Sequence, residues 1–173
     1  MGVKIFQVDA FTDKPFTGNP AAVCVLAAPA DAGWMQSVAG EMTLSETAFV
    51  WPREEAHGLR WFTPTLEVDL CGHATLAAAH ALWSEDIVDA TQEIQFQTKS
   101  GLLTCRRRDS MIELDFPVTP ARPASDDEAL NAALGVQPTF VGQSRLDALV
   151  VVDSEETVRS LRPDFVALAA LPF

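Results

Sequence analysis

The chain has 173 residues, of which 48% are hydrophobic and 21% are charged. This composition allows a packed hydrophobic core and excludes disorder over the whole chain. Asp and Glu number 24 against 12 Lys and Arg, so the formal net charge is -12, which disfavours nucleic acid and anionic membranes as partners.

Hydropathy and the cysteines indicate the cellular compartment and exclude some kinds of partner. No apolar run approaches the roughly 20 residues that a membrane helix requires. The three cysteines, Cys24, Cys71 and Cys105, are odd in number, far apart and in no CxxC pair. This pattern is typical of reduced thiols rather than of a disulfide framework or a zinc site. We therefore expect a cytoplasmic protein with no membrane partner and no bound metal.

Hydrophobic patterning predicts strands and one helix in the first third of the chain. Apolar or alternating runs typical of strands occupy four segments, 3–11, 21–26, 47–51 and 59–62. Turn-forming residues fill 12–20. Asp31 is an N-cap candidate for a helix whose apolar residues, from Trp34 to Met42, recur on one face.

The segment Cys71–Trp83 is rich in alanine and carries no formal charge when its histidines are neutral. Alanine is the strongest helix former, and a helix that is apolar nearly all round is buried on all sides. Three strands with the alternation of an antiparallel meander follow at 93–97, 102–106 and 112–116. We predict an α/β protein of the α+β type, with a mostly antiparallel sheet curled around a central buried helix.

Composition divides the chain into two domains. The proline-rich segment 117–125 is linker-like and separates a first domain at 1–116 from a second at 126–173. The second domain is predicted to contain a helix, two strands and a helix, at 126–134, 139–141, 149–152 and 155–161. Its strand, strand, helix order repeats that of residues 5–42.

The last nine residues, 165–173, contain no charge, whereas chain ends are usually polar and frayed. An apolar tail calls for a partner surface. We therefore expect the second domain to be an incomplete copy of the first, in a chain that is the N-terminal portion of a longer protein or is completed by another chain.

Glu46 is the first candidate for proton chemistry. It lies between Leu44 and Ala48 at a helix-to-strand transition, with Ser45 beside it. In apolar surroundings the charged form of a carboxyl group is destabilised, so its pKa rises toward the range useful for proton transfer. From spacing alone, a solvent-exposed glutamate in a turn remains the commoner interpretation.

Gly72 and His73 open the alanine-rich helix. Free backbone N–H groups and the helix dipole make such a start an anion site, and glycine lets a ligand approach closely. His73 could bind a substrate carboxylate or pass a proton, or it could simply cap a buried helix. His80 is interpreted as a hydrogen-bonded core residue, and the spacing of Cys71, His73 and His80 does not indicate a metal site.

Cys71 next to the helix start could be a thiolate base, although a small buried hydrophobe is the commoner role of such a cysteine. Glu67 and Asp69 would project to the same side of an extended segment and are interpreted as solvated charges rather than an acid pair. The sequence contains no phosphate loop, GxGxxG, GxSxG or HExxH motif, so nucleotide cofactors and serine hydrolase chemistry lack support.

Three segments together carry a family resemblance: Val8–Val23 with its Phe16-Thr17-Gly18-Asn19-Pro20 core, Glu41–Val50, and Arg60–Thr75 with Cys71-Gly72-His73. In this order and spacing the chain resembles the PhzF-like family of phenazine-biosynthesis isomerases and epimerases. The matching segments span most of the first 80 residues.

The resemblance implies a diaminopimelate-epimerase-like fold of two similar halves and a reaction that needs no cofactor. It implies that Glu46 is the catalytic acid/base and that His73 helps to hold and protonate the substrate, a small carboxylate. It further implies that Ser45, Gly72 and Asn19 line the pocket. A homodimer, or completion by a missing C-terminal half, is the expected assembly.

One departure from the family pattern affects the expected site. Family members carry an Asp-Pro-Val-Thr-Gly-Ser-like segment in their second half, and Phe116-Pro117-Val118-Thr119-Pro120 is only an echo of it. We therefore expect the isolated chain to hold an incomplete site. Two alternatives stay open: a cysteine-based epimerase or racemase that uses Cys71, and a non-catalytic domain that binds small anions.

Overall fold

The computed structural model describes residues 2–125, 127–145 and 147–171. The chain divides into two compact units, Met1–Pro117 and Val118–Phe173, which are described separately. The sequence predicts the first domain at 1–116, a linker at 117–125 and the second domain at 126–173. The predicted helix start at Asp126 and the last two residues of the apolar tail lie outside the described residues.

A mixed sheet forms the framework of the first unit. Its strands are β1 (Lys4–Ala10), β2 (Asn19–Val25), β3 (Glu46–Pro52), β4 (His57–Phe62), β5 (Glu67–Val68), β6 (Ile94–Thr98), β7 (Gly101–Arg108) and β8 (Met111–Asp115). They lie in the order β1-β2-β3-β4-β6-β7-β8, and β5 pairs with β4 outside this path. The β2–β3 and β4–β6 pairs are parallel and the others are antiparallel.

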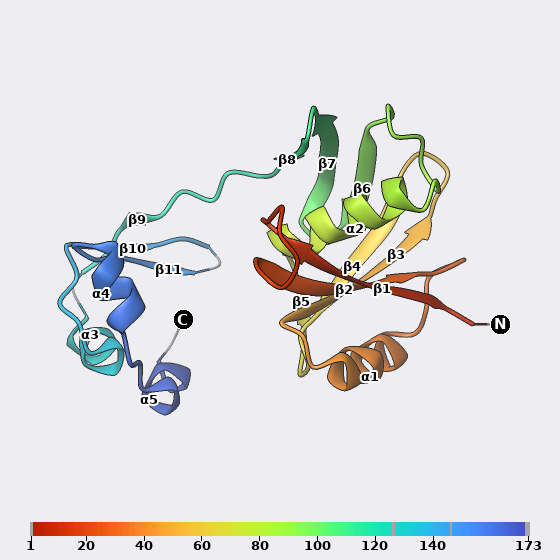
Figure 1. Ribbon diagram of the computed structural model, residues 1–173. Coiled ribbons are helices and arrows are strands. Elements are labelled where there is room, and N and C mark those ends of the chain that lie inside the picture. The colour runs from red at the N-terminus through yellow and green to blue at the C-terminus, as the bar shows by residue number, and fades with distance from the viewer. Residues whose placement is uncertain (1, 126, 146, 172–173) are drawn as a thin grey trace. The chain divides into compact units, whose positions relative to one another are not determined.

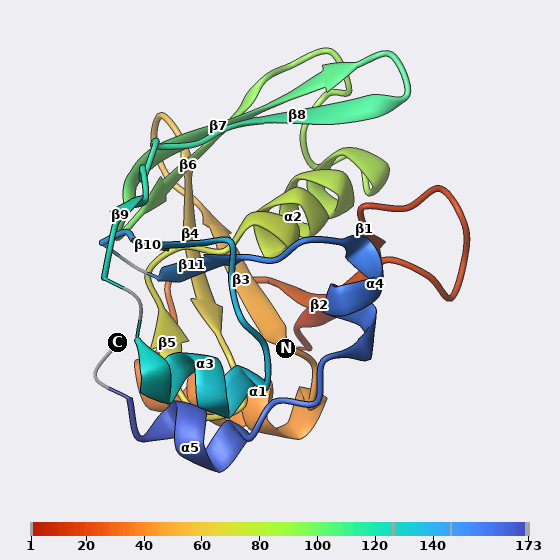
Figure 2. The same cartoon turned by 90° about the vertical axis from the view of Figure 1, so that its left-hand side faces the viewer.

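The sheet curls around one helix and carries a second on its other face (Figures 1 and 2). The inner helix is α2 (Gly72–Ser84), and the outer one is α1 (Ala32–Met42). This architecture confirms the predicted α+β class, the central buried helix and the antiparallel meander of β6, β7 and β8. The two-residue strand β5, which leads into α2, was not predicted.

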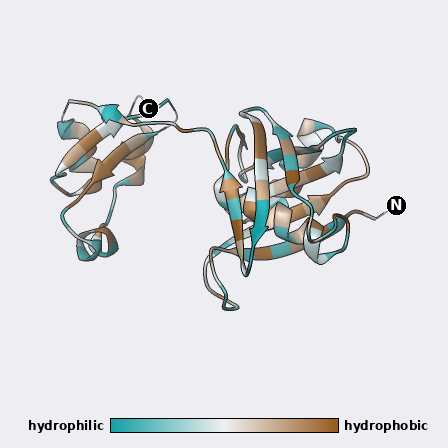
Figure 3. Ribbon diagram, turned by 90° about the horizontal axis from the view of Figure 1, so that it is seen from above, coloured by the Kyte–Doolittle hydropathy of each residue, from teal (hydrophilic) through white to brown (hydrophobic). Residues whose placement is uncertain are grey.

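Strand alternation separates the apolar side chains of the sheet into two cores. Ala48 and Val50 of β3 pack with α2, whereas Phe49 and Trp51 pack on the opposite face with Met35 of α1. Figure 3 shows bands of hydrophobic and hydrophilic residues along several other strands of the sheet. Because side chains two residues apart share a face, Glu46 lies on the α2 face of β3.

Helix α2 is buried because small residues on its surface let strands approach from several directions. Ala74, Ala77 and Ala78 are fully buried, and the helix contacts β1, β2, β3 and β8. The prediction that His80 lies in the core is wrong. His80 is exposed, and its Nε2 lies 3.3 Å from Ser84 Oγ, because α2 is left uncovered at this position.

Helix α1 starts and ends with local signals that the sequence contains. The Asp31 side chain accepts a hydrogen bond from Trp34 N at 3.0 Å, as predicted for an N-cap. The helix ends at Thr43, whose left-handed backbone (φ 54°) stops the helix. The two residues that follow, Leu44 and Ser45, lead directly into β3 and Glu46.

The second unit is small. It contains β9 (Arg122–Pro123), β10 (Phe140–Gln143) and β11 (Ala148–Val151) in the antiparallel order β11-β10-β9, and the helices α3 (Glu128–Leu134), α4 (Glu155–Ser160) and α5 (Phe165–Ala169). Strand β9 falls inside the segment predicted as a linker. The order β10, β11, α4 matches the order β1, β2, α1.

The predicted apolar tail contains helix α5, which leaves Phe165 74% and Val166 84% exposed. None of the helices among the described residues is long and apolar enough to cross a membrane.

Candidate active site

Glu46 is the first residue of β3, and its side chain is 20% exposed. It points to the face of the sheet that α2 covers, in phase with Ala48 and Val50. The interpretation of Glu46 as an exposed turn residue therefore does not describe its surroundings. A carboxylate at the edge of an apolar core is partly protected from water.

His73 is the second residue of α2 and is 8% exposed. Its Nε2 lies 3.3 Å from Glu46 Oε2 and 3.2 Å from Ser45 Oγ. Burial lowers the pKa of His73 below its ordinary value, and the negative charge of Glu46 opposes this effect. The imidazole is therefore neutral near pH 7 and can donate or accept a hydrogen bond.

Asn19 and Ser45 meet because β2 and β3 run parallel, with Ala21 opposite Glu46. Ser45 Oγ lies 3.4 Å from Asn19 Oδ1 and 3.5 Å from the Pro20 carbonyl oxygen. The structure thus brings Asn19, Ser45, Glu46 and His73 into one connected group. Their roles in binding and catalysis remain predictions.

Gly72 starts α2, directly before His73. A Cβ atom at this position would lie 3.9 Å from Phe116 Cε2, which is ordinary van der Waals contact. Packing within the chain therefore does not require glycine here. Room for a ligand at the helix start remains the predicted reason for it.

Cys71 is the N-cap residue of α2, and its Sγ lies 3.4 Å from His73 Nδ1. Burial raises the pKa of this thiol to about 12, and the Glu46 charge acts in the same direction. The backbone N–H groups of Ala74 and His73 favour the thiolate, but neither makes a capping hydrogen bond to the side chain. Cys71 is therefore a neutral thiol near pH 7, which disfavours its predicted alternative role as a thiolate base.

The contact between Cys71 Sγ and His73 Nδ1 was not predicted. The Cys-Gly-His spacing at a predicted helix start is the signal that could have predicted it. An N-cap side chain and the side chain two residues later both lie at the mouth of the helix, where they can meet.

Within the described part of the chain, Glu46, Cys71 and His73 are the group of potential ligands close enough to hold a metal ion. One ligand atom from each lies within 4.8 Å of the others. Spacing along the sequence could not reveal this group, because Glu46 comes from a different element. The expectation of no metal and no cofactor stays an expectation.

A network of charged side chains braces the segment that leads into α2. Arg60 of β4 binds Glu67 of β5 through two hydrogen bonds of 2.6 and 2.7 Å. Lys99 Nζ lies 2.6 Å from Glu67 Oε2 and 3.7 Å from Asp69 Oδ1, and Ser100 Oγ donates to the Asp69 carbonyl oxygen at 2.8 Å. The prediction of a solvated charge is wrong for Glu67, which is 16% exposed, because Arg60 and Lys99 cover its carboxylate.

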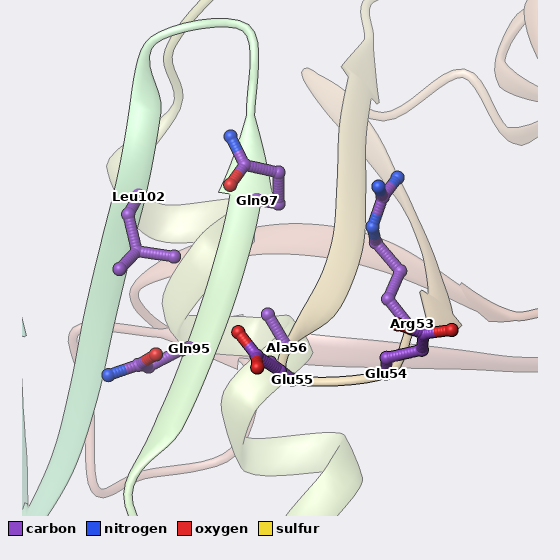
Figure 4. Close-up of a pocket in the computed structure, with 7 residues that line it drawn as sticks. All are labelled: Arg53, Glu54, Glu55, Ala56, Gln95, Gln97 and Leu102. Carbon is purple, nitrogen blue, oxygen red and sulfur yellow. The ribbon is translucent and has the colours of Figure 1, made fainter.

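A separate depression of about 720 Å³ lies between the turn that joins β3 to β4 and the strands β6 and β7 (Figure 4). It is lined by the turn residues, by two polar side chains of β6 and by one apolar side chain of β7, namely Arg53, Glu54, Glu55, Ala56, Gln95, Gln97 and Leu102. None of the predicted site residues lines it. The candidate active site is therefore the group at the start of α2.

A protein-family model described as "Phenazine biosynthesis-like protein" (PhzC-PhzF) matches residues 8–172. The chain belongs to the PhzC-PhzF family. It is 53% identical over 169 residues to "Uncharacterized isomerase BH0283" of Halalkalibacterium halodurans, and this match covers 97% of the chain and 64% of that relative. The chain thus spans less than two thirds of the length of that PhzC-PhzF relative.

Solved structures agree with the family and extend the fold comparison. A PhzF family crystal structure from Enterococcus faecalis matches with a TM-score of 0.86 and 40% identity, over 100% of this chain and 66% of that one. A hydroxyproline epimerase from Agrobacterium vitis matches with a TM-score of 0.58 and 12% identity, over 82% of this chain and 48% of that one. The second likeness shows the fold alone, and it confirms the predicted epimerase-like architecture of this PhzC-PhzF member.

Proposed function

We propose that this chain carries the proton-transfer residues of a cofactor-independent isomerase that acts on a small carboxylate. The observation that carries the proposal is the 3.3 Å approach of Glu46 Oε2 to His73 Nε2 at the start of a buried helix. Membership of the PhzC-PhzF family and a relative named as an isomerase support the same class of reaction.

In the proposed reaction, the Glu46 carboxylate removes a proton from a carbon next to a conjugated system. The electron pair left on that carbon is delocalised over the double bonds and the carboxyl group of the substrate. Glu46, now protonated, returns the proton to a different carbon of the same molecule, so that atoms and charge balance without a redox partner. One carboxyl group can act as base and then as acid when its surroundings hold it between water and an apolar core.

The start of α2 is the proposed site for the negative charge of the substrate. The helix has 13 residues, and its first N–H groups and its dipole favour an anion at this end. His73 Nε2 would donate to the substrate, and Ser45 and Asn19 would complete the polar side of the pocket. Gly72 would leave room for the ligand.

For the whole protein, we propose that the active site also contains residues from outside this chain. Because the chain covers 64% of its relative, residues from a further segment or from a second copy are proposed to complete the site. A homodimer stays a prediction. A cytoplasmic setting is proposed on the strength of three unpaired, buried cysteines.

The test measures exchange of substrate hydrogen with solvent. The protein is incubated in D2O with a panel of small carboxylates that carry an acidic C–H beside a conjugated double bond, and loss of the C–H signal is followed by proton NMR. Glu46→Gln should abolish the exchange, because the amide cannot accept the proton. Glu41→Gln, the same change at an exposed position of α1, should leave it intact.

Three outcomes distinguish the candidate functions. Exchange that is lost only in Glu46→Gln supports the proposal. Exchange that survives Glu46→Gln contradicts the role of Glu46. Saturable binding of a carboxylate, measured by calorimetry, without exchange in the unmodified protein would contradict catalysis and favour the anion-binding alternative.

A further inference from the structure

Three side chains from two elements form a continuous hydrogen-bonding chain at the start of α2. Cys71 Sγ lies 3.4 Å from Nδ1 of His73, and the opposite ring nitrogen, Nε2, lies 3.3 Å from Glu46 Oε2. The imidazole is therefore held at both nitrogens. Because a neutral imidazole carries one N–H donor and one bare nitrogen, which nitrogen holds the hydrogen decides what His73 can do.

The partners of Nε2 require a donor on that nitrogen. A Glu46 carboxylate only accepts hydrogen bonds, so a bare Nε2 at 3.3 Å would set two lone pairs against each other. The Ser45 hydroxyl does not need Nε2 as an acceptor, because it can donate to Asn19 Oδ1 or to the Pro20 carbonyl oxygen. It can then accept from Nε2 through its own lone pairs.

The partner of Nδ1 can supply the matching donor. A cysteine is a thiol near pH 7 unless its surroundings favour the thiolate, so an S–H group of Cys71 faces the ring, with Sγ 3.4 Å from Nδ1. Nδ1 of His73 is the acceptor that the structure places within reach.

We propose that Cys71 is a positioning residue whose thiol donates to His73 Nδ1 and so presents the Nε2–H of His73 to Glu46 and to the substrate. Cys71 then acts as a hydrogen-bond donor that orients His73, and not as a thiolate base. The importance of Cys71 for catalysis rests on the proposed function. An Nε2–H donor on His73 is useful only if a substrate carboxylate or the Glu46 carboxylate must be held next to it.

The experiment reads the protonation of each ring nitrogen directly. The full chain is labelled with nitrogen-15 in its histidines, and two-bond proton–nitrogen correlation spectra are recorded at a pH where His73 is neutral. His73→Gln assigns the His73 signals by their disappearance. The unmodified protein should show a protonated Nε2 and a bare, hydrogen-bonded Nδ1.

Three variants then test the source of the hydrogen bond to Nδ1. Cys71→Ala should move the Nδ1 resonance downfield, toward that of a bare nitrogen with no donor, and Cys71→Ser should restore it because a hydroxyl can donate from the same position. Cys105→Ala removes a fully buried thiol of the same core and should leave the His73 signals unchanged. A merely structural role of the sulfur would not produce this restoration by serine.

Two results would overturn the inference. One is a hydrogen on Nδ1 of His73 in the unmodified protein, which by itself decides the question even if a variant fails to fold. The other is an Nδ1 resonance that is identical in the unmodified protein and in Cys71→Ala. Neither result depends on turnover, so failure here is distinguishable from failure of the Glu46 exchange test.

Discussion

At the scale of single residues, the candidate site depends on where the side chains of Glu46, His73 and Cys71 lie relative to the buried helix α2. Glu46 reaches the site because it continues the inward face of β3, and His73 reaches it because it opens α2. Burial shifts the pKa values of His73 and Cys71 in opposite directions. It lowers the pKa of the His73 imidazole and raises that of the Cys71 thiol to about 12, so both groups are neutral near pH 7.

The thiols provide a first prediction. Cys24, Cys71 and Cys105 are all buried, and burial raises their pKa values to about 11, 12 and 12. We expect the native protein to react with iodoacetamide near pH 7 far more slowly than the urea-unfolded protein, because the nucleophile is the thiolate. Peptide mass spectrometry measures the labelling of each cysteine. Rapid, stoichiometric labelling of Cys71 in the native state would contradict this account and revive the cysteine-base alternative.

The site residues could be predicted from the sequence to different depths. Its apolar neighbours made Glu46 a candidate for proton chemistry, but spacing alone favoured an exposed turn residue, and the family resemblance decided for a site residue. The phase of Glu46 with Ala48 and Val50 is a local signal that would have placed it on the buried face. The contacts of His73 with Glu46 and Ser45 depend on the packing of α2 against β3, which no local pattern encodes.

At the scale of elements, the brace of Arg60, Glu67 and Lys99 fixes the short strand β5 and the approach to α2. The hydrogen bonds from Arg60, followed by those from Lys99, lower the pKa of Glu67 against the opposing effect of burial. A carboxyl group with a lowered pKa stabilises the fold above its ordinary pKa, and this contribution is lost as the pH falls through the lowered value.

The brace leads to a second prediction. Glu67→Gln should lower the free energy of unfolding by about 1–3 kcal/mol near neutral pH, because charged hydrogen bonds are lost and Arg60 keeps an unmatched charge. In urea titrations the difference from the unmodified protein should shrink in acid, once the pH has fallen through the lowered pKa of Glu67 and the group is protonated in both states.

Glu93 provides the matched control for Glu67. It pairs with Arg106, but the two side chains are 34% and 39% exposed, and exposed ion pairs contribute little. Glu93→Gln should therefore have little effect at either pH. Equal losses in the two variants, or a loss in Glu67→Gln that persists in acid, would contradict the structural role of the brace.

Secondary structure could be predicted from the sequence where the signal was local. The alternation of β6, β7 and β8, the alanine content of α2 and the Asp31 cap of α1 all predicted elements that the structure contains. Strand β5 has two residues, too few for any periodicity. The exposure of His80 depends on which side of α2 the sheet leaves open, which is a property of the tertiary structure.

At the scale of the whole molecule, nearly all of the core belongs to the first unit. Both apolar clusters lie between Ala21 and Cys105, apart from partly buried side chains at their margins. In the second unit the described buried side chains are those of α3, namely Leu130, Asn131 and Ala133. A unit with so little buried apolar surface cannot offset the entropy of folding by itself.

This difference leads to a third prediction. A fragment of residues 1–117 should unfold in urea in one cooperative transition, with dispersed amide signals in NMR spectra. A fragment of residues 118–173 should show neither property. A cooperative transition in the smaller fragment, or its absence in the larger one, would contradict the division of stability between the units.

Sheet order is the feature of the whole molecule that the sequence could not specify. The parallel pairing of β4 with β6 consists of two residue pairs, His57 with Phe96 and Gly58 with Gln97. Helix α2 lies between these two strands in the sequence. Hydrophobic alternation predicts that a strand has a buried face but does not identify its neighbour. The apolar surface of α2 predicted a sheet wrapped around this helix, and the family resemblance implied the same architecture, but neither specified the order of the strands.

The central claim is that the Glu46 carboxylate faces the His73 imidazole at the start of α2, and a pH titration of His73 tests it most directly. Carbon-bound ring protons of His73 are followed by NMR in the unmodified protein, in Glu46→Gln and in the control Glu41→Gln. The Glu46 charge raises the pKa of His73 against the effect of burial, so Glu46→Gln should lower that pKa further below its ordinary value while Glu41→Gln leaves it in place. A His73 pKa that is the same with and without the Glu46 charge would contradict the account.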